Sequence, residues 1–413
     1  MRLKKLLSLG LTMSMFVVAC PISANAVDKI DKIQGADKYE TAGLIADKQN
    51  YTTAILVNTD STMADGLSAS GLAGVTNAPI LLTKKNNIPS ATLKRVEKAN
   101  KVYIIGGESS IDKATETFLK DKGIETKRLQ GSDRIKTSYD VAKEINSINK
   151  VNKVILTNAF KGEPDAMSIA SVAVRDKAPI VLTDGKSVPF NTTGVESYVI
   201  GGISSMNDKL VNNTNSTRLG GVDRYDTNNK IVNKFYSGAK EFYIASGTDL
   251  VYALVGSTIA KNNPIILIDT NSDKNILEGS SKITAIGIEN NSIIQQCIDI
   301  SNGIKKYGWI KLGDSWHYYN KDGTEVSNYD LALKKANKVL GDKYEAYLIE
   351  NTDSLPNFTQ TYLDEYYFFG ITYKIDDSDS DSAILVNKKN FYAFQIDSVG
   401  RISELEKYSD PSF

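Results

Sequence analysis

The sequence predicts an α/β fold built from three tandem copies of one domain, followed by a small α+β domain. Short apolar runs alternate with helix-length segments over the first three hundred residues. Continuous apolar strands between helices are typical of a parallel sheet that is covered on both faces. The same series of segments returns at intervals of about 90–100 residues, which is the size of a whole small domain rather than of a solenoid repeat.

The first copy lays out its elements in a regular order. We expect strands at 54–57, 80–82 and 102–105, because these runs are apolar and rich in branched residues. The segments between and around them have the length and pattern of helices, and Ser110 is a suitable cap for the last one. These expected helices lie at 41–49, 67–75, 92–99 and 110–123.

Three short motifs mark the copies. Each copy opens with Gly-x-Asp, a basic residue and, three residues later, Thr, at 35–41, 131–137 and 221–227. A proline-led apolar strand follows, and an Ile-Gly step ends the next strand. The strand motif reads Pro79-Ile80-Leu81-Leu82-Thr83, Pro179-Ile180-Val181-Leu182-Thr183 and Pro264-Ile265-Ile266-Leu267, and the strand ends read Ile105-Gly106-Gly107, Ile200-Gly201-Gly202 and Ile286-Gly287.

Residues 1–26 have the features of an export signal. A basic start precedes the apolar run 6–19, and Ala24-Asn25-Ala26 offers small residues for cleavage. This predicts a secreted protein of the cell wall or cell surface. Cleavage before Cys20, as in a lipoprotein, is the alternative. No later segment approaches the roughly 20 apolar residues of a spanning helix, so we expect no transmembrane segment.

The charge balance and the residue types exclude several functions. Lysine plus arginine and aspartate plus glutamate both number 49, so the chain lacks the basic excess that nucleic-acid binding needs. His317 is the only histidine, which leaves no His-Glu-x-x-His motif and little for a Ser-His or Cys-His pair. We therefore expect no catalytic or metal-binding residues in the repeated part, and no cofactor.

Taken together, the motifs resemble the clostridial cell-wall-binding repeats of the second type, which anchor surface-layer-associated proteins. The resemblance covers residues 30–300. It implies three α/β domains about a pseudo-threefold axis that bind an anionic wall polysaccharide, with surface-layer proteins as further candidate partners. We assign the domains accordingly: a signal peptide at 1–26 and repeats at 28–127, 128–217 and 218–301.

The resemblance also implies site residues, because it links the apolar triplet to polysaccharide binding. Thr83 and Thr183 directly follow two of the triplets and could hydrogen-bond a sugar or a phosphate. From the residues alone, such runs are more often buried strands. The matching triplets are Ile80, Leu81 and Leu82; Ile180, Val181 and Leu182; and Ile265, Ile266 and Leu267.

The charged residues of the openings allow two interpretations. Lys38, Arg134 and Arg224 could bind phosphate or carboxylate groups of the polymer, and structural salt bridges between repeats are an equal alternative. The aspartate before each is expected to cap a helix. The third copy departs from the pattern, because Tyr252 stands where Asp65 and Asp165 stand, so its ligand contact is expected to differ.

The tail has a different character. Residues 302–327 are aromatic and resemble one choline-binding-type repeat, in which His317 takes an aromatic slot; a packing hairpin is the favoured interpretation, because choline cages form between successive repeats. Residues 328–413 are expected to form a small α+β domain with a helix at 329–340. Asp377, Asp379 and Asp381 alternate as in a calcium loop but lack its glycine and distal glutamate, which favours a turn.

Two functions of the tail remain open at this stage. The first makes it an interaction domain that the wall anchor displays. The second makes it a wall hydrolase that uses a pair of carboxylates. No spacing singles out such a pair among Glu345, Glu350, Asp364 and Glu365.

Overall fold

The computed structural model describes most of the repeated part of the chain and portions of the tail. The predicted signal peptide, Cys20, Glu350, Asp364, Glu365 and Asp377 lie outside the described residues, and so does the side chain of His317. The described residues are 27–303 apart from 28, 61 and 271, and then 308–312, 315–319, 325–326, 328–340, 343–348, 366–373, 379–388, 393–396 and 401–406.

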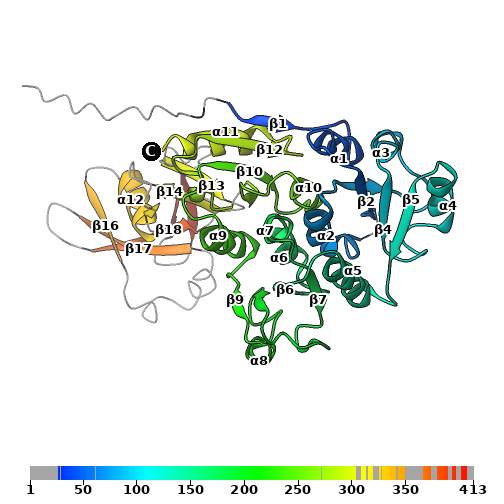
Figure 1. Ribbon diagram of the computed structural model, residues 1–413. Helices are drawn as coiled ribbons and strands as arrows, with labels where there is room; N and C mark the ends of the chain where they lie inside the picture. Colours follow the sequence, from blue (N-terminus) through cyan, green and yellow to red (C-terminus); the bar gives the residue numbers. More distant parts are fainter. Residues whose placement is uncertain are drawn as a thin grey trace, which may run out of the picture.

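Three four-stranded parallel sheets form the repeated part, and each defines one structural unit (Figure 1). The first unit has the order β3 (Ile80–Thr83), β2 (Thr53–Asn58), β4 (Lys101–Ile105) and β5 (Glu125–Leu129). The second has the order β7 (Ile180–Thr183), β6 (Lys153–Asn158), β8 (Glu196–Ile200) and β9 (Thr217–Leu219). The third has the order β11 (Ile265–Ile268), β10 (Glu241–Ser246), β12 (Lys282–Ile286) and β1 (Asp31–Ile33). The predicted α/β class with three parallel-sheet units is confirmed.

The edge strand of the third unit comes from the other end of the chain. β1 pairs in parallel with β12, with Asp31 opposite Thr284 and Ile33 opposite Ile286. β5 and β9 likewise stand directly before the openings of the second and third copies, so every sheet borrows its edge strand from the copy that follows. For the third sheet, that copy is the first one. The three units therefore close into a ring.

Three helices begin at the opening motifs, and the motif explains why. The side chain of Asp37 accepts a hydrogen bond from the backbone N–H of Glu40, as a helix cap does. The N–H of Gly35 donates to Oγ1 of Thr41 over 2.9 Å, and a Cβ on this glycine would lie 2.6 Å from the nitrogen of Thr41. Asp133 and Asp223 cap in the same way, as expected; the helices are α1 (Lys38–Ala46), α5 (Arg134–Ile148) and α9 (Arg224–Phe235).

The second set of helices meets at the centre of the ring (Figure 1). A Cβ on Gly71 would lie 2.3 Å from the carbonyl oxygen of Ala178, and one on Gly74 would lie 2.1 Å from that of Val174. Glycine therefore permits this close backbone approach. One buried apolar cluster includes residues of all three units. The central helices are α2 (Ala69–Thr76), α7 (Ala170–Asp176) and α10 (Val251–Gly256), preceded by η1 (Gly66–Ser68) in the first unit and α6 (Glu163–Ser168) in the second.

The outer faces of the three sheets are covered differently. Two helices cover the first sheet, α3 (Ser90–Val96) and α4 (Lys113–Asp121). In the second unit the chain runs from β7 to β8 without a helix, and only α8 (Asp208–Asn213) follows β8. In the third unit η2 (Asn275–Leu277) and α11 (Asn291–Ser301) take the corresponding places.

The tail contains two antiparallel sheets, consistent with the predicted α+β character. The larger sheet has the order β16 (Tyr344–Leu348), β17 (Tyr366–Tyr373), β18 (Asp379–Asn387), β19 (Ala393–Ile396) and β20 (Ile402–Glu406). Helix α12 (Asn328–Leu340) packs on it through Ala332 and Ala336, against Phe369 and Ile384. The turn expected at the alternating aspartates is wrong for Asp379 and Asp381, because both lie in β18, where Asp379 pairs with Thr372. The smaller sheet joins β13 (Gly308–Leu312), β14 (Ser315–Tyr319) and β15 (Glu325–Val326).

Candidate functional site

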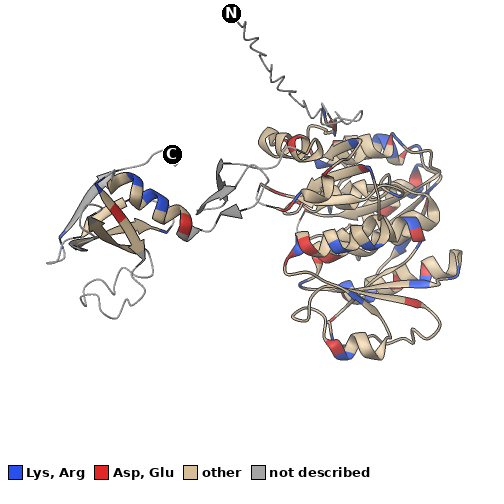
Figure 2. Cartoon of the chain, turned by 90° about the vertical axis from the view of Figure 1, so that its left-hand side faces the viewer, with Lys and Arg blue, Asp and Glu red and all other residues tan. Residues whose placement is uncertain are grey.

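The strand order creates a crevice in each unit. In the first unit β2 and β4 are neighbours. The chain passes from β2 to β3 on one side of this pair, and from β4 to β5 on the other side. The carboxyl ends of two such strands form the usual ligand site of an open α/β sheet. The opening of the following copy lies across this crevice, so three equivalent positions arise, which we call junction sites. Figure 2 shows basic and acidic residues interspersed along the ribbon of the repeats.

The first junction site contains a carboxylate held against a glycine. Gly106 has φ +112°, and a Cβ on it would lie 2.5 Å from Oδ2 of Asp65. Burial raises the pKa of Asp65, while the Ser110 hydroxyl, the Arg134 guanidinium and the Thr137 hydroxyl act in the opposite direction. An aspartate of the first unit thus faces the opening of the second copy.

The second junction site repeats this arrangement. Gly201 has φ +124°, and a Cβ on it would lie 2.8 Å from Oδ2 of Asp165. Burial raises the pKa of Asp165 to about 6, and the guanidinium of Arg224 opposes this shift. The carboxyl group therefore changes its charge close to neutral pH.

The third junction site differs from the other two. Gly287 has φ +65°, and a Cβ on it would lie 2.3 Å from Cγ of Tyr252. The tyrosine ring thus occupies the place of the two aspartates, which confirms the expected substitution. Burial, with the carboxylates of Asp249, Glu289 and Asp37 nearby, raises the pKa of its hydroxyl group. This junction has an aromatic ring where the others have a carboxylate.

The three cations of the openings lie at the carboxyl end of the first strand of their own unit. Arg134 donates from Nη1 to the carbonyl oxygen of Ala159 over 2.9 Å and lies over the ring of Phe160. Arg224 donates to the carbonyl oxygen of Gly247. Lys38 instead forms an ion pair with Asp60, 2.8 Å from Nζ to Oδ1. The two arginines are half-buried and keep further donors for other partners.

Sequence reasoning missed a second pair of arginines. Arg128 donates from Nη1 to the carbonyl oxygen of Gly106 over 2.8 Å, and Arg218 donates to that of Gly201 over 2.9 Å. The Nη2 of Arg128 is buried and has no hydrogen-bond partner among the described residues. The signal was present, because an Arg-Leu pair precedes the opening in both the second and the third copy. In the first copy Lys32 holds this position and donates to Asn291.

Three segments of the chain match one family of wall-binding domains. Residues 32–116, 128–211 and 218–296 each match the family described as cell wall binding domain 2, or CWB2. The chain belongs to the cell wall binding domain 2 family. Its three repeats are therefore cell wall binding domains, as the resemblance of the sequence motifs predicts.

Relatives and solved structures agree with this membership. The chain is 31% identical over 282 residues to the N-acetylmuramoyl-L-alanine amidase LytC of Bacillus subtilis, across 65% of this chain and 55% of the relative. It is 31% identical over 261 residues to the amidase enhancer of the same organism, across 61% of this chain and 36% of the relative. The chain thus spans about half of the first relative and about a third of the second.

Two solved structures from Clostridium difficile share the fold. Cwp8 superposes with a TM-score of 0.61 at 30% identity, over 67% of this chain and 52% of that one. Cwp6 superposes with a TM-score of 0.61 at 24% identity, over 75% of this chain and 57% of that one. At this identity the likeness shows a shared fold alone.

The triplets that the resemblance linked to binding lie inside the CWB2 units. Ile80 and Leu82 pack into the central cluster, and Leu81 packs into the outer cluster of the first sheet. Because these side chains are buried, a polymer does not reach them in this conformation, which agrees with the interpretation of the triplets as buried strands. Their role in polysaccharide binding stays a prediction. The same burial holds for Ile180, Val181, Leu182, Ile265, Ile266 and Leu267.

The two threonines after the triplets are buried as well. Thr83 donates to the carbonyl oxygens of Lys84 and Asn87. Thr183 accepts a hydrogen bond from the N–H of Gly185 over 2.7 Å. Both hydroxyls therefore hold the loop that leaves the strand, and their proposed contact with a sugar is untested.

The described part of the CWB2 chain offers little for metal or thiol chemistry. No group of three histidine, cysteine, aspartate or glutamate side chains is placed to hold a metal ion there. Cys297 is buried, and burial raises its pKa to about 12, so this thiol stays protonated at neutral pH. None of the described helices has the length and apolar character needed to cross a membrane.

Proposed function

We propose that the three repeats anchor an exported protein to the wall by binding an anionic wall polysaccharide at the junction sites. The observation that supports this most is the repetition of one arrangement at two junctions: a half-buried arginine, a carboxylate and a turn of glycine backbone at the carboxyl ends of the strands. Guanidinium groups suit phosphate and carboxylate groups in particular.

The chemistry of the two aspartates fits a sugar polymer. An ionised carboxylate accepts hydrogen bonds from sugar hydroxyls, and a protonated one donates a hydrogen bond to an anionic group. The raised pKa of Asp165 makes both forms accessible near pH 6. The second junction is thus suited to a ligand that carries both hydroxyl and acidic groups, and burial raises the pKa of Asp65 at the first junction as well.

Rigidity would add to the strength of the anchor. The central helices hold the units together in one buried cluster, so two junction sites keep a fixed spacing. A polymer bound at one site then has a high effective concentration at the other. Weak contacts at each junction therefore combine into firm retention.

In this proposal the repeats bind and the tail is cargo. We infer that residues 1–26 direct export and that the region from 328 onwards is displayed on the cell surface. The first relative is named as an amidase, so a carboxylate-based hydrolase in the tail is kept as the alternative. Glu345 lies in β16 and is exposed. Incubation of the protein with purified walls tests this: release of muropeptides or sugars, lost in Glu345→Gln, would favour the hydrolase.

Sedimentation with walls tests the anchor. The protein without residues 1–26 is mixed with purified walls and with walls from which hydrofluoric acid has removed the phosphate-linked polymers. We expect pelleting with intact walls, loss of pelleting with stripped walls, and weaker pelleting as salt rises. Undiminished pelleting with stripped walls would assign the binding to peptidoglycan and overturn the polysaccharide proposal.

A further inference from the structure

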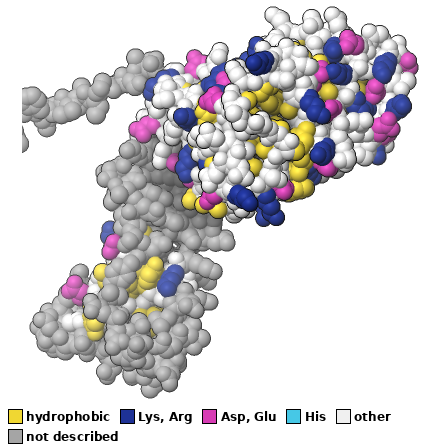
Figure 3. Space-filling view, turned by 60° about the horizontal axis from the view of Figure 1, so that its bottom comes forward, with side chains coloured by type: hydrophobic (Ala, Val, Ile, Leu, Met, Phe, Trp, Pro, Cys, Tyr) yellow, Lys and Arg dark blue, Asp and Glu magenta, His cyan; other side chains and the backbone are white. Residues whose placement is uncertain are grey.

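The second unit has a pocket at a position that helix α3 covers in the first unit. In the first unit the seventeen residues between β3 and β4 include helix α3, whereas the twelve residues between β7 and β8, 184–195, contain no helix. A pocket with a volume of about 720 Å³ opens at this place, within the range of about 300–1,000 Å³ that is usual for small-ligand sites. Figure 3 shows apolar side chains gathered on this side of the molecule with basic side chains beside them.

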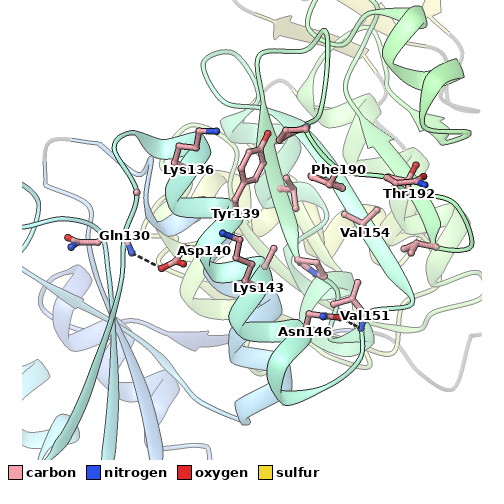
Figure 4. Close-up of a pocket in the computed structure, with 17 residues that line it drawn as sticks. Gln130, Lys136, Tyr139, Asp140, Lys143, Asn146, Val151, Val154, Phe190 and Thr192 are labelled. Carbon is pink, nitrogen blue, oxygen red and sulfur yellow. Dashed lines mark hydrogen bonds between the residues drawn. The ribbon is translucent and has the colours of Figure 1, made fainter.

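The pocket has an apolar floor and aromatic walls. Val154 and Val181 of the sheet form its floor, where the first unit has Ala54 and Leu81 packed beneath Val96 of α3. Tyr139 of α5 and Phe190 of the loop meet edge to face, with ring centroids 5.8 Å apart. In Figure 4 the side chains from α5 line one side, and Phe190 and Thr192 line the other.

The loop that forms this wall is firmly held. Thr192 donates from its buried hydroxyl to the carbonyl oxygen of Thr214 over 2.9 Å. At the start of the loop the backbone N–H groups of Lys186 and Ser187 donate to Oδ1 of Asp184. The pocket is therefore largely preformed.

The charges around the pocket are reversed relative to the equivalent position of the first unit. In the first unit Arg95 of α3 is buried and forms ion pairs with Glu40 and Asp47. Counted from the capping aspartates Asp37 and Asp133, the positions of Glu40 and Asp47 correspond to Lys136 and Lys143. The position of Gly43, which contacts Arg95, corresponds to Tyr139. A cation fills this place in the first unit, and two cations border it in the second.

Both lysines are available to a ligand. Lys136 and Lys143 are exposed, and neither forms an ion pair within the described residues; Nζ of Lys136 lies over the Tyr139 ring. Asp140 also lines the pocket and accepts a hydrogen bond from the N–H of Gln130 over 3.2 Å. The third unit has no such pair, because Asp226 and Asn233 hold the two positions.

We propose that this pocket binds a small amphiphilic anion. Its apolar aliphatic or aromatic body lies between Tyr139 and Phe190 on the valine floor, and its acidic group takes the place of the Arg95 guanidinium, between Lys136 and Lys143. This site adjoins the first junction site, because Gln130 and Gly131 line the pocket, but Asp65, Gly106 and Arg134 do not line it. The proposal does not depend on the function of the junction sites.

Fluorescence titration with two matched probes tests the proposal. 8-Anilinonaphthalene-1-sulfonate carries an anionic group, and N-phenyl-1-naphthylamine has the same rings without it. We expect the full chain to bind the sulfonate. The double variant Lys136→Glu with Lys143→Glu should weaken this binding by about tenfold, because each exposed ion pair contributes a few-fold to the affinity and the reversed charges repel the probe. Affinity for the uncharged probe should stay within about twofold. Phe190→Ala should weaken the binding of both probes.

The control is Lys94→Glu, an exposed lysine on α3 of the first unit, which should leave both titrations unchanged. Equal sulfonate binding by the double variant and the original chain would overturn the proposal, and so would binding that Phe190→Ala leaves unchanged. A dimer in sedimentation velocity that Phe190→Ala dissolves would also overturn it, because the occupant would then be a second copy.

Discussion

The carboxylate of Asp165 lies directly against the backbone of Gly201, so that a Cβ on this glycine would come within 2.8 Å of Oδ2. Asp65 and Gly106 repeat the relationship one unit earlier. Because a buried acid lies at the junction of two units, we expect both pH and a substitution of the glycine to change the stability of that junction.

Asp165→Asn should change how stability depends on pH. The folded protein holds the proton of Asp165 with a pKa of about 6, against an ordinary value of 3.8. The folded state therefore binds more protons between these values, and the free energy of unfolding falls as pH rises from about 4 to about 6. The asparagine variant lacks this loss and should be more stable at pH 7 by on the order of 1–3 kcal/mol.

Urea unfolding at pH 4.5 and pH 7 measures the difference between the two proteins. Asp184→Asn is the control, because hydrogen bonds from the backbone lower the pKa of that exposed aspartate. A difference between Asp165→Asn and the original chain that is the same at both pH values would contradict the assignment.

Gly201→Ala should destabilise the second junction. The residue has φ +124°, and the new Cβ would lie 2.6 Å from Oγ of Ser205. We expect a loss of about 2–3 kcal/mol from backbone strain and crowding together. Gly194→Ala is the matched control, because Gly194 has φ +78° with nothing within 4 Å, and it should cost only about 1 kcal/mol. Equal losses in thermal unfolding would show that the contact with the junction contributes nothing.

Arg134→Gln combined with Arg224→Gln should weaken retention on walls. Each substitution removes a guanidinium from a junction site and keeps a shorter, uncharged polar side chain. We expect about tenfold weaker binding in wall sedimentation, with thermal unfolding shifted by only a few degrees. Lys150→Gln, an exposed lysine at a distance from the junction motifs, should bind as the original chain does. If the arginine variant also binds unchanged, the anion site lies elsewhere.

Arg95→Met should destabilise the first unit. The Arg95 side chain is only 4% exposed and forms ion pairs with Glu40 and Asp47. Its hydrogen bonds are the main reason why the pKa of Asp47 falls to about 2. Removing it leaves two carboxylates without their buried partner, at a cost of roughly 3 kcal/mol. Lys98→Met removes an exposed partner of Asp47 and should cost less than about 1 kcal/mol in the same urea titration.

Removal of residues 27–33 should loosen the third unit selectively. β12 would lose its parallel partner β1 and become an edge strand. Hydrogen exchange should accelerate in 282–286, while β4 and β8 keep their protection, since their own edge strands β5 and β9 remain. Unchanged exchange in β12 would mean that β1 contributes little to the fold.

The elements could largely be predicted from the sequence, because apolar strands, capping aspartates and small-residue helices are local patterns. Helix α1 begins three residues earlier than expected, since Asp37 rather than Thr41 marks its start. The pairing of β1 with β12 could not be predicted, because no local pattern relates strands that lie about 250 residues apart. The same limit applies to the junction sites. Asp165 and Arg224 come from different copies, and only the packing of the units brings them together.

The closed ring bears on how a surface protein withstands pulling. Asn302, where the ring ends, exchanges two hydrogen bonds with Val27 at its beginning, of 2.8 and 3.0 Å. Tension on the tail therefore reaches the ring beside its first strand, and the load is divided between β1 and α11 rather than carried by one terminal element. In a wall anchor with this topology, peeling from either end of the described ring must first break these hydrogen bonds.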